Sequence, residues 1–223
     1  MSTTDSVSNA VLRRWPAALF SAFAVLTFGA AEAYEEPAYR VIEKNDVFEI
    51  RDYEPYLVAE VEVRADFKKA GNQAFRVLFD YISGENIRQE EISMTVPVNQ
   101  QSVHDEGEKI EMTTPVLQTP GAEEVGTYRF SFVMPAEYTL DTLPLPKDER
   151  IEIRQVPAKK VAVLRYSGSW SESNYRKNES LLLTSLADRE LATEGQPIYA
   201  RYNSPFTLWF LRRNEVLVEL APR

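Results

Sequence analysis

A short internal repeat constrains the fold of this chain more than any other feature of its sequence. The repeated residues are Glu49-Ile50-Arg51, Pro55 and Val58-Ala59 in the first copy, and Glu152-Ile153-Arg154, Pro157 and Val161-Ala162 in the second. Each copy runs on into a strand pattern and then a helix pattern, so the order of elements repeats as well as the residues. The sequence therefore predicts two related halves of one domain, at about 34–126 and 127–223.

Alternating apolar side chains around the first copy predict strands that bury one face. In the stretch 57–63 every second residue is Leu, Ala or Val, which is the period of two expected of a half-buried strand. Phe48 and Ile50 alternate in the same way after an Asn45-Asp46 turn, so we expect a hairpin to open the folded domain. Similar strand patterns lie at 92–98, 110–116, 128–134 and 216–220.

Two helices are predicted, one after each copy of the repeat. The first begins at the N-cap residue Asp66, ends at Gly84 and carries an apolar stripe along one side. The second begins near Ser169, where Ser169-Trp170-Ser171-Glu172 has the form of a capping box. A mostly antiparallel sheet with two helices laid on it is an α+β fold, and we expect this sheet to curl into a distorted β-barrel.

Residues 1–33 have the pattern of a secretory signal peptide. Two arginines precede an apolar run at 15–28, and Ala31-Glu32-Ala33 provides the small residues that flank a cleavage site. The run is short and rich in alanine for a membrane span, so cleavage before Tyr34 is favoured over an uncleaved anchor. We therefore expect a folded domain at 34–223 that is periplasmic or secreted.

The counts of charged residues, cysteine and histidine exclude several classes of site. Lys and Arg number 25 against 34 Asp and Glu, and a net charge of -9 repels phosphate backbones, so no nucleic-acid partner is expected. The chain has no cysteine, which excludes disulfides, thiol nucleophiles and zinc–thiolate sites. His104 is the single histidine, so a site with several imidazole ligands is impossible.

Three groups of residues resemble one known family. They are Met94-Thr95-Val96-Pro97-Val98 with Met112-Thr113-Thr114-Pro115-Val116, the strand Phe130-Ser131-Phe132-Val133-Met134-Pro135, and the terminal set Tyr202, Asn203, Pro205 and Arg212-Arg213-Asn214-Glu215. With these motifs the chain resembles the SOUL haem-binding family over nearly all of residues 34–223. The resemblance implies a distorted barrel of two pseudo-twofold halves, each with a long helix. It also implies reversible, non-covalent binding of haem or a related tetrapyrrole in a shallow apolar groove beside the first helix.

The second half of the first helix is apolar around more of its circumference than one contact with a sheet requires. Phe75 and Phe79 lie one turn apart, with Leu78 and Ile82 nearby, and we predict that these four residues form an apolar ledge for the face of haem. Arg76 is the candidate partner for the propionate groups. In the alternative interpretation, loops or a second copy of the chain cover this face and Arg76 is a solvated surface charge.

An iron ligand is not defined by the sequence. His104 is the candidate, but it lies in a polar loop that would have to fold over the groove; otherwise it is an exposed loop histidine. Met94, Met112 and Tyr81 also carry ligating atoms, although thioethers on strands and a tyrosine on a helix more often pack in apolar surroundings. The absence of cysteine excludes covalent attachment of c-type haem.

We therefore predict a carrier or sequestering protein for haem or a related tetrapyrrole, without catalytic residues. Two alternatives remain open: an exported, hydrolase-like enzyme acting on a small hydrophobic or tetrapyrrole substrate, and a module whose exposed helix binds a protein partner. An enzyme requires an acid or base in the groove, and the sequence offers no Ser/His pair at plausible positions. Arg212 and Arg213 point to opposite faces as they enter a strand, so we expect a structural role in pairing with acidic residues across the sheet.

Overall fold

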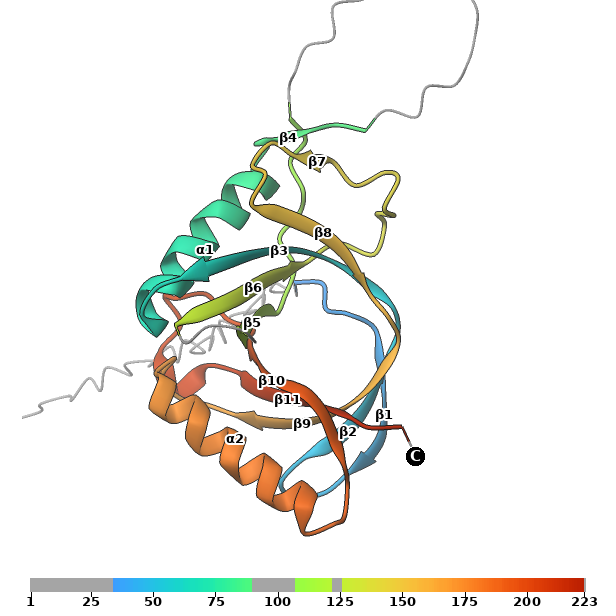
Figure 1. Ribbon diagram of the computed structural model, residues 1–223, viewed down its shortest axis with the longest axis vertical. Helices are drawn as coiled ribbons and strands as arrows, with labels where there is room; N and C mark the ends of the chain where they lie inside the picture. The colour runs from blue at the N-terminus through green and yellow to red at the C-terminus, as the bar shows by residue number, and fades with distance from the viewer. Residues whose placement is uncertain (1–33, 90–106, 122–125, 223) are drawn as a thin grey trace, which may run out of the picture. The chain divides into compact units, whose positions relative to one another are not determined.

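The computed structural model describes residues 34–89, 107–121 and 126–222 of the chain (Figure 1). The large sheet contains β1 (Tyr39–Lys44), β2 (Glu49–Tyr53), β3 (Tyr56–Arg64), β5 (Val116–Pro120), β6 (Thr127–Val133), β8 (Ile151–Val156), β9 (Lys159–Tyr166), β10 (Thr193–Arg201) and β11 (Asn214–Leu220). The other elements are the helices α1 (Phe67–Ile82) and α2 (Glu172–Ala187), the 3-10 turn η1 (Trp209–Leu211), and the short paired strands β4 (Asn86–Ile87) and β7 (Leu145–Pro146). Among these described residues, no helix is long and apolar enough to cross a bilayer.

The order of strands in the large sheet shows how the two repeats combine. The order is β1-β2-β9-β11-β10-β5-β6-β3-β8, every neighbouring pair is antiparallel, and the sheet is strongly curled (Figure 1). The repeat β2-β3-α1-β5-β6 and the repeat β8-β9-α2-β10-β11 take equivalent places on either side of the β5–β10 pair. Each repeat contributes its first strand to the other: β2 pairs with β9, and β8 pairs with β3. The predicted α+β fold with a distorted, mostly antiparallel barrel is therefore confirmed.

The boundary between the repeats lies later in the chain than the sequence suggested. β6 pairs with β3 in the first repeat as β11 pairs with β9 in the second, so β6 belongs to the first repeat. The chain therefore passes from one repeat to the other after Val133, whereas the sequence placed this point at 126. The segment between β6 and β8 contains β7 and three prolines, Pro135, Pro144 and Pro146.

The two helices differ in how closely they follow their predicted starts. α1 has Asp66 at its N-cap, and Gly84 follows its end with a φ of +119°, a conformation that glycine adopts without strain. α2 begins at Glu172, and its N-cap is Ser171, whose hydroxyl accepts a hydrogen bond from the Asn174 amide. The prediction near Ser169 was therefore about one half-turn early, because Ser171 rather than Ser169 satisfies the first helical amides.

The stretch 110–116 was predicted as a strand and is not one. It runs irregularly until β5 begins at Val116, since Pro115 has no amide hydrogen to donate to a ladder. The stretch is still held in place: the Ile110 amide donates to Ile82 at the end of α1, and the Thr113 hydroxyl donates to the carbonyl of Val133. The predicted strand at 92–98 lies outside the described residues.

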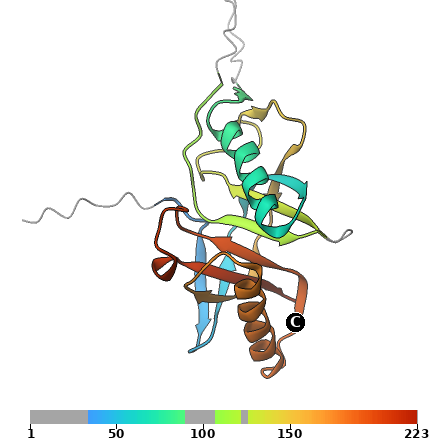
Figure 2. The ribbon, with the colours of Figure 1, turned by 90° about the vertical axis from the view of Figure 1, so that its left-hand side faces the viewer.

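The core has three parts that follow from the alternation of side chains along the strands. Both helices pack on the same face of the sheet, which we call the outer face, with α1 over β3 and β6 and α2 over β9 and β11 (Figure 2). On β3, Ala59 and Val61 face α1, whereas Val58 belongs to a third cluster on the opposite, inner face. On β9, Ala162 faces α2 and Val163 the inner face. β3 and β9 thus bury both of their faces.

Candidate functional site

Two phenylalanines of α1 form an apolar ledge at the surface. The rings of Phe75 and Phe79 are stacked, with their centroids 5.7 Å apart and their planes inclined by 14°. Phe79 is 45% exposed, while Phe75 is half-buried and meets the ring of Phe132 on β6 at 5.4 Å, edge towards face. The outer ring is therefore open to solvent and the inner ring is fixed against the sheet. We call this pair the Phe75–Phe79 ledge.

Leu78 and Ile82, the other two residues predicted for the ledge, lie in the core. They continue the stripe of Ala70 and Ala74 at helical spacing, and this stripe faces the sheet under α1. Both side chains are buried, so they support the helix from beneath and present no surface to a ligand. Only the two phenylalanines of the predicted set are open to contact.

Arg76 lies on the exposed side of α1, three residues before Phe79. Side chains three residues apart on a helix are neighbours, so its guanidinium can reach the edge of the ledge. Its assignment to propionate binding stays a prediction.

Of the candidate iron ligands, the structure describes two, and each is engaged elsewhere. The Tyr81 hydroxyl is buried and donates a hydrogen bond of 2.7 Å to the carbonyl of Pro144, and burial raises its pKa. Met112 packs partly buried against the core under α1. His104 and Met94 lie outside the described residues. Within the described part of the chain, no three His, Asp or Glu side chains gather as metal ligands would.

The ledge is an open surface, and two clefts lie elsewhere on the described residues. A cleft of about 430 Å³ is lined by residues at the start of the folded domain and by the ends of β3 and β6, including Tyr56 and Tyr138. A second cleft, of about 520 Å³, lies beside β9 and the end of β11, including Lys159 and Glu219. Neither of these clefts is lined by Phe75 or Phe79.

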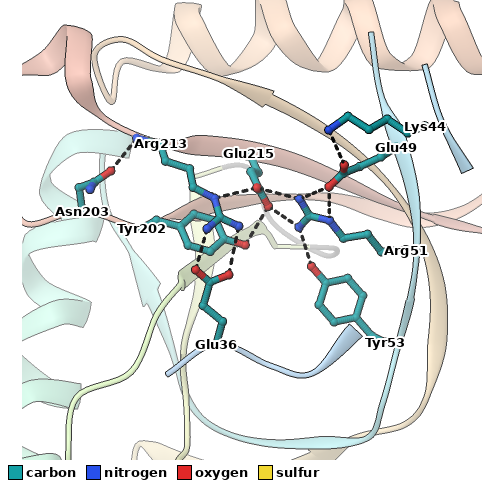
Figure 3. A network of polar contacts seen from close by, with 9 residues as sticks. All are labelled: Glu36, Lys44, Glu49, Arg51, Tyr53, Tyr202, Asn203, Arg213 and Glu215. Carbon is teal, nitrogen blue, oxygen red and sulfur yellow. Dashed lines mark hydrogen bonds and ion pairs between the residues drawn. The ribbon is translucent and has the colours of Figure 1, made fainter. Parts of the chain in front are cut away.

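A network of buried charges occupies the inner face, and Glu215 on β11 is its centre (Figure 3). Two nitrogens of Arg51 donate to this carboxylate at 2.7 and 2.9 Å, the Tyr202 hydroxyl donates at 2.8 Å, and Nε of Arg213 donates at 3.0 Å. Burial by itself raises the pKa of Glu215, but the hydrogen bonds and charge of Arg51, with Arg213 and Tyr202, outweigh it and hold the pKa below its ordinary value. The carboxylate therefore stays ionised at neutral pH.

The same network ties the start of the folded domain to its last strand. Arg213 binds Glu36 through two hydrogen bonds of 2.6 and 3.1 Å, and its backbone amide donates to the Asn203 side chain at 2.6 Å (Figure 3). Arg212 points the other way, and its guanidinium lies over the Trp170 ring at 4.2 Å. Arg213 has the predicted structural role in pairing with acidic residues, but its partners are not across the sheet: Glu36 precedes β1, and Glu215 lies on the strand that Arg213 enters. The motif that contains Asn203, Arg212, Arg213 and Glu215 therefore stabilises the fold.

The arginines of the repeated motif have a related structural role, which the sequence did not predict. Arg51 neutralises Glu215, and its counterpart Arg154 neutralises Glu60, a buried carboxylate on β3, with hydrogen bonds of 3.2 and 2.9 Å. In both repeats, an arginine on the first strand pairs with a glutamate that is buried on the inner face of the sheet. The signal that indicates this role is the recurrence of arginine at the same place in the two copies of the repeat, together with a glutamate in an otherwise mostly apolar strand.

Comparison with known proteins gives one family match and several similar structures. The family model described as "SOUL heme-binding protein" matches residues 34–106 and 99–219. The human protein named "Heme-binding protein 2" is 27% identical over 201 residues, which cover 83% of this chain and 90% of that protein. A crystal structure of the EcmrR C-terminal domain has a TM-score of 0.56 at 9% identity, covering 83% of this chain and 99% of that one. A hydrolase from Listeria innocua has a TM-score of 0.50 at 8% identity, covering 81% and 94%. At these identities the two structures show a shared fold alone.

Proposed function

Because this chain belongs to the SOUL heme-binding protein family, we propose that it binds haem or a related tetrapyrrole reversibly. The human relative is named for haem binding and aligns with most of this chain, which supports a ligand of that class. The family is described by binding and not by catalysis, so the proposal includes no chemical step. We choose the surface of α1 because Phe79 is 45% exposed and its ring is stacked on that of Phe75, which packs against the core.

The Phe75–Phe79 ledge suits one face of a planar, amphipathic ligand. Apolar contact there contributes roughly 25 cal/mol for each Å² removed from water, so affinity would come mainly from burial. Phe75 is already fixed by Phe132, and little side-chain freedom is lost when a ligand settles on the pair. Arg76, at the exposed margin of the same helix, would pair with a propionate carboxylate.

We place this binding in a carrier or sequestering role outside the cytoplasm. The support is the signal pattern of residues 1–33 and the absence of cysteine, which leaves non-covalent binding as the mode of attachment. The likeness to the Listeria innocua hydrolase is one of fold at 8% identity, and it adds no support to the enzymatic alternative.

Titration of residues 34–223 with ferric haem, followed by the Soret band, tests the proposal. We expect saturable binding that Phe79→Asp weakens by about tenfold or more, because burial of a phenylalanine contributes roughly 1.5–3 kcal/mol. Leu181→Asp on α2 is the matched control, since Leu181 is exposed to a similar degree and should leave binding unchanged. Absence of saturable binding would refute the function, and equal binding by the Phe79 variant would refute the site.

Two further variants separate the roles of the polar candidates. Arg76→Gln should weaken binding of haem by less than about fivefold and leave binding of a propionate-esterified porphyrin unchanged, because only the free acid offers it a carboxylate. An equal effect on both ligands would assign Arg76 a structural role.

His104→Ala should leave the Soret spectrum unchanged if no loop histidine ligates iron, and a changed spectrum would identify His104 as a ligand.

A further inference from the structure

The connection between β10 and β11 exposes an unusual amount of apolar surface. Phe206 is 95% exposed, and four residues that follow it within the same connection are each more than half exposed: Leu208, Trp209, Phe210 and Leu211. Soluble proteins rarely gather large apolar side chains at one exposed place without a use for them. We call residues 204–211 the apolar loop.

The apolar loop is held in shape by Arg212. The guanidinium of Arg212 donates to the carbonyls of Pro205 and Thr207, each at 2.8 Å, and lies over the Trp170 ring. One cation therefore joins both sides of the loop and fastens it to the start of α2. The exposure of the apolar side chains belongs to a fixed conformation.

Backbone groups of the loop also find partners within the protein. The Trp209 carbonyl accepts from the Gly168 amide at 3.0 Å, and the Leu211 amide donates to the Leu208 carbonyl at 2.9 Å within η1. A backbone group that is already hydrogen-bonded does not have to be stripped of water when its segment enters an apolar layer. This lowers the cost of burying the loop in such a layer.

The charge around the loop is opposite to that of the chain as a whole. The apolar loop contains no Asp or Glu and is followed by Arg212, whose guanidinium donates to backbone carbonyls of the loop, whereas the chain carries a net charge of -9. This region can therefore approach lipid headgroups without the repulsion that the acidic remainder of the surface would meet.

We propose that the apolar loop docks the protein on the surface of a lipid bilayer, with Phe206, Trp209 and Phe210 entering the region between headgroups and acyl chains. Tryptophan and phenylalanine beside arginine are suited to that boundary. Side chains this exposed can all enter a fluid layer together, whereas a protein partner would need a cavity shaped for each of them. Docking goes beyond the proposed function and requires no haem.

Sedimentation with phosphatidylcholine vesicles, in the absence of haem, tests the docking. Residues 33–223 form a compact unit that contains all three core clusters, so residues 34–223 can be used, and the apolar run at 15–28 is left out. We expect the Phe206→Asp/Trp209→Asp double variant to bind vesicles at least about tenfold more weakly, because two aromatic anchors are lost. The matched control Leu181→Asp should bind as the unmodified protein does.

Three further readouts decide the result. Vesicle binding should persist at about 1 M salt, where the Debye length is about 3 Å, and its loss there would mean that charge rather than insertion drives it. Tryptophan emission should shift to the blue when vesicles are added, and the double variant, which keeps Trp170 but lacks Trp209, should not show this shift. Failure of the unmodified protein to sediment, or equal sedimentation by the double variant, would overturn the proposal. So would self-association that the double variant abolishes while vesicles have no effect, because the loop would then bind a second copy.

Discussion

Replacing Glu215 with glutamine tests the buried charge network most directly. Glu215→Gln keeps the volume of the side chain but removes the negative charge that Arg51, only 2% exposed, faces on the inner side of the sheet. Breaking a buried pair in this way costs about 3–5 kcal/mol. Glu49 still contacts Arg51 and Glu36 still binds Arg213, so we expect the lower end of this range, about 3 kcal/mol.

The assay is thermal unfolding of residues 34–223 followed by circular dichroism. For a domain of this size, 1 kcal/mol shifts Tm by about 2–4 °C, so the variant should melt roughly 10 °C lower. Asp148→Asn is the matched control: Asp148 binds Arg150 through both oxygens, as Glu215 binds Arg51, but this pair lies at the surface and should contribute less than about 1 kcal/mol. Equal losses in the two variants would refute the role assigned to Glu215.

The pH dependence of stability provides a second measurement on the same pair of proteins. The pKa of Glu215 in the folded state lies below its ordinary value of 4.5, so its contribution to stability is complete above that pH. The contribution is lost as the pH falls through the folded-state pKa. The Glu215→Gln variant should therefore lose less stability than the unmodified protein on acidification. Parallel stability curves would show that Glu215 does not titrate differently in the two states.

Three other predictions concern local features. In urea-induced unfolding, Ser171→Ala should lower the free energy of unfolding by about 1 kcal/mol and Ser169→Ala by much less. Equal losses would contradict the assignment of Ser171 as the N-cap of α2. Leu78→Ala should cost about 2–5 kcal/mol while Phe79→Ala costs little, and the reverse order would mean that α1 presents its other side to the sheet. Burial raises the pKa of Tyr53 to about 12. Its phenol should stay protonated in an absorbance titration at pH values near 10. The stability that the protonated phenol contributes to the folded state should be lost as the pH rises towards 12.

Local patterns in the sequence predicted most of the elements of the fold. The alternation at 57–63 identified β3, and Asp66 and Gly84 marked the ends of α1. What the sequence could not provide is the partner of each strand. β2 pairs with β9, far along the chain, and nothing within either strand specifies this choice. β10 was missed because its first half is polar and exposed and shows no alternation.

The candidate site was predicted in part. The surplus of apolar residues on α1 includes an exposed Phe79 stacked on a half-buried Phe75, and the role of this pair in ligand binding stays a prediction. The same surplus could not show how the helix is rotated against the sheet, so Leu78 and Ile82 were included although the core needs them. The pair of Arg51 and Glu215 was beyond reach, because the two residues are 164 positions apart and only the folded sheet brings them together.

The exchange of first strands between the repeats has a mechanical consequence. If either repeat unfolded alone, β3 would lose its partner β8 or β9 would lose its partner β2. We therefore expect the two helices to unfold together and not one after the other. A ligand on α1 would therefore delay the melting of α2, although α2 does not touch it. Heating this protein should produce a single unfolding transition. A ligand bound anywhere on its surface should raise the Tm of that transition.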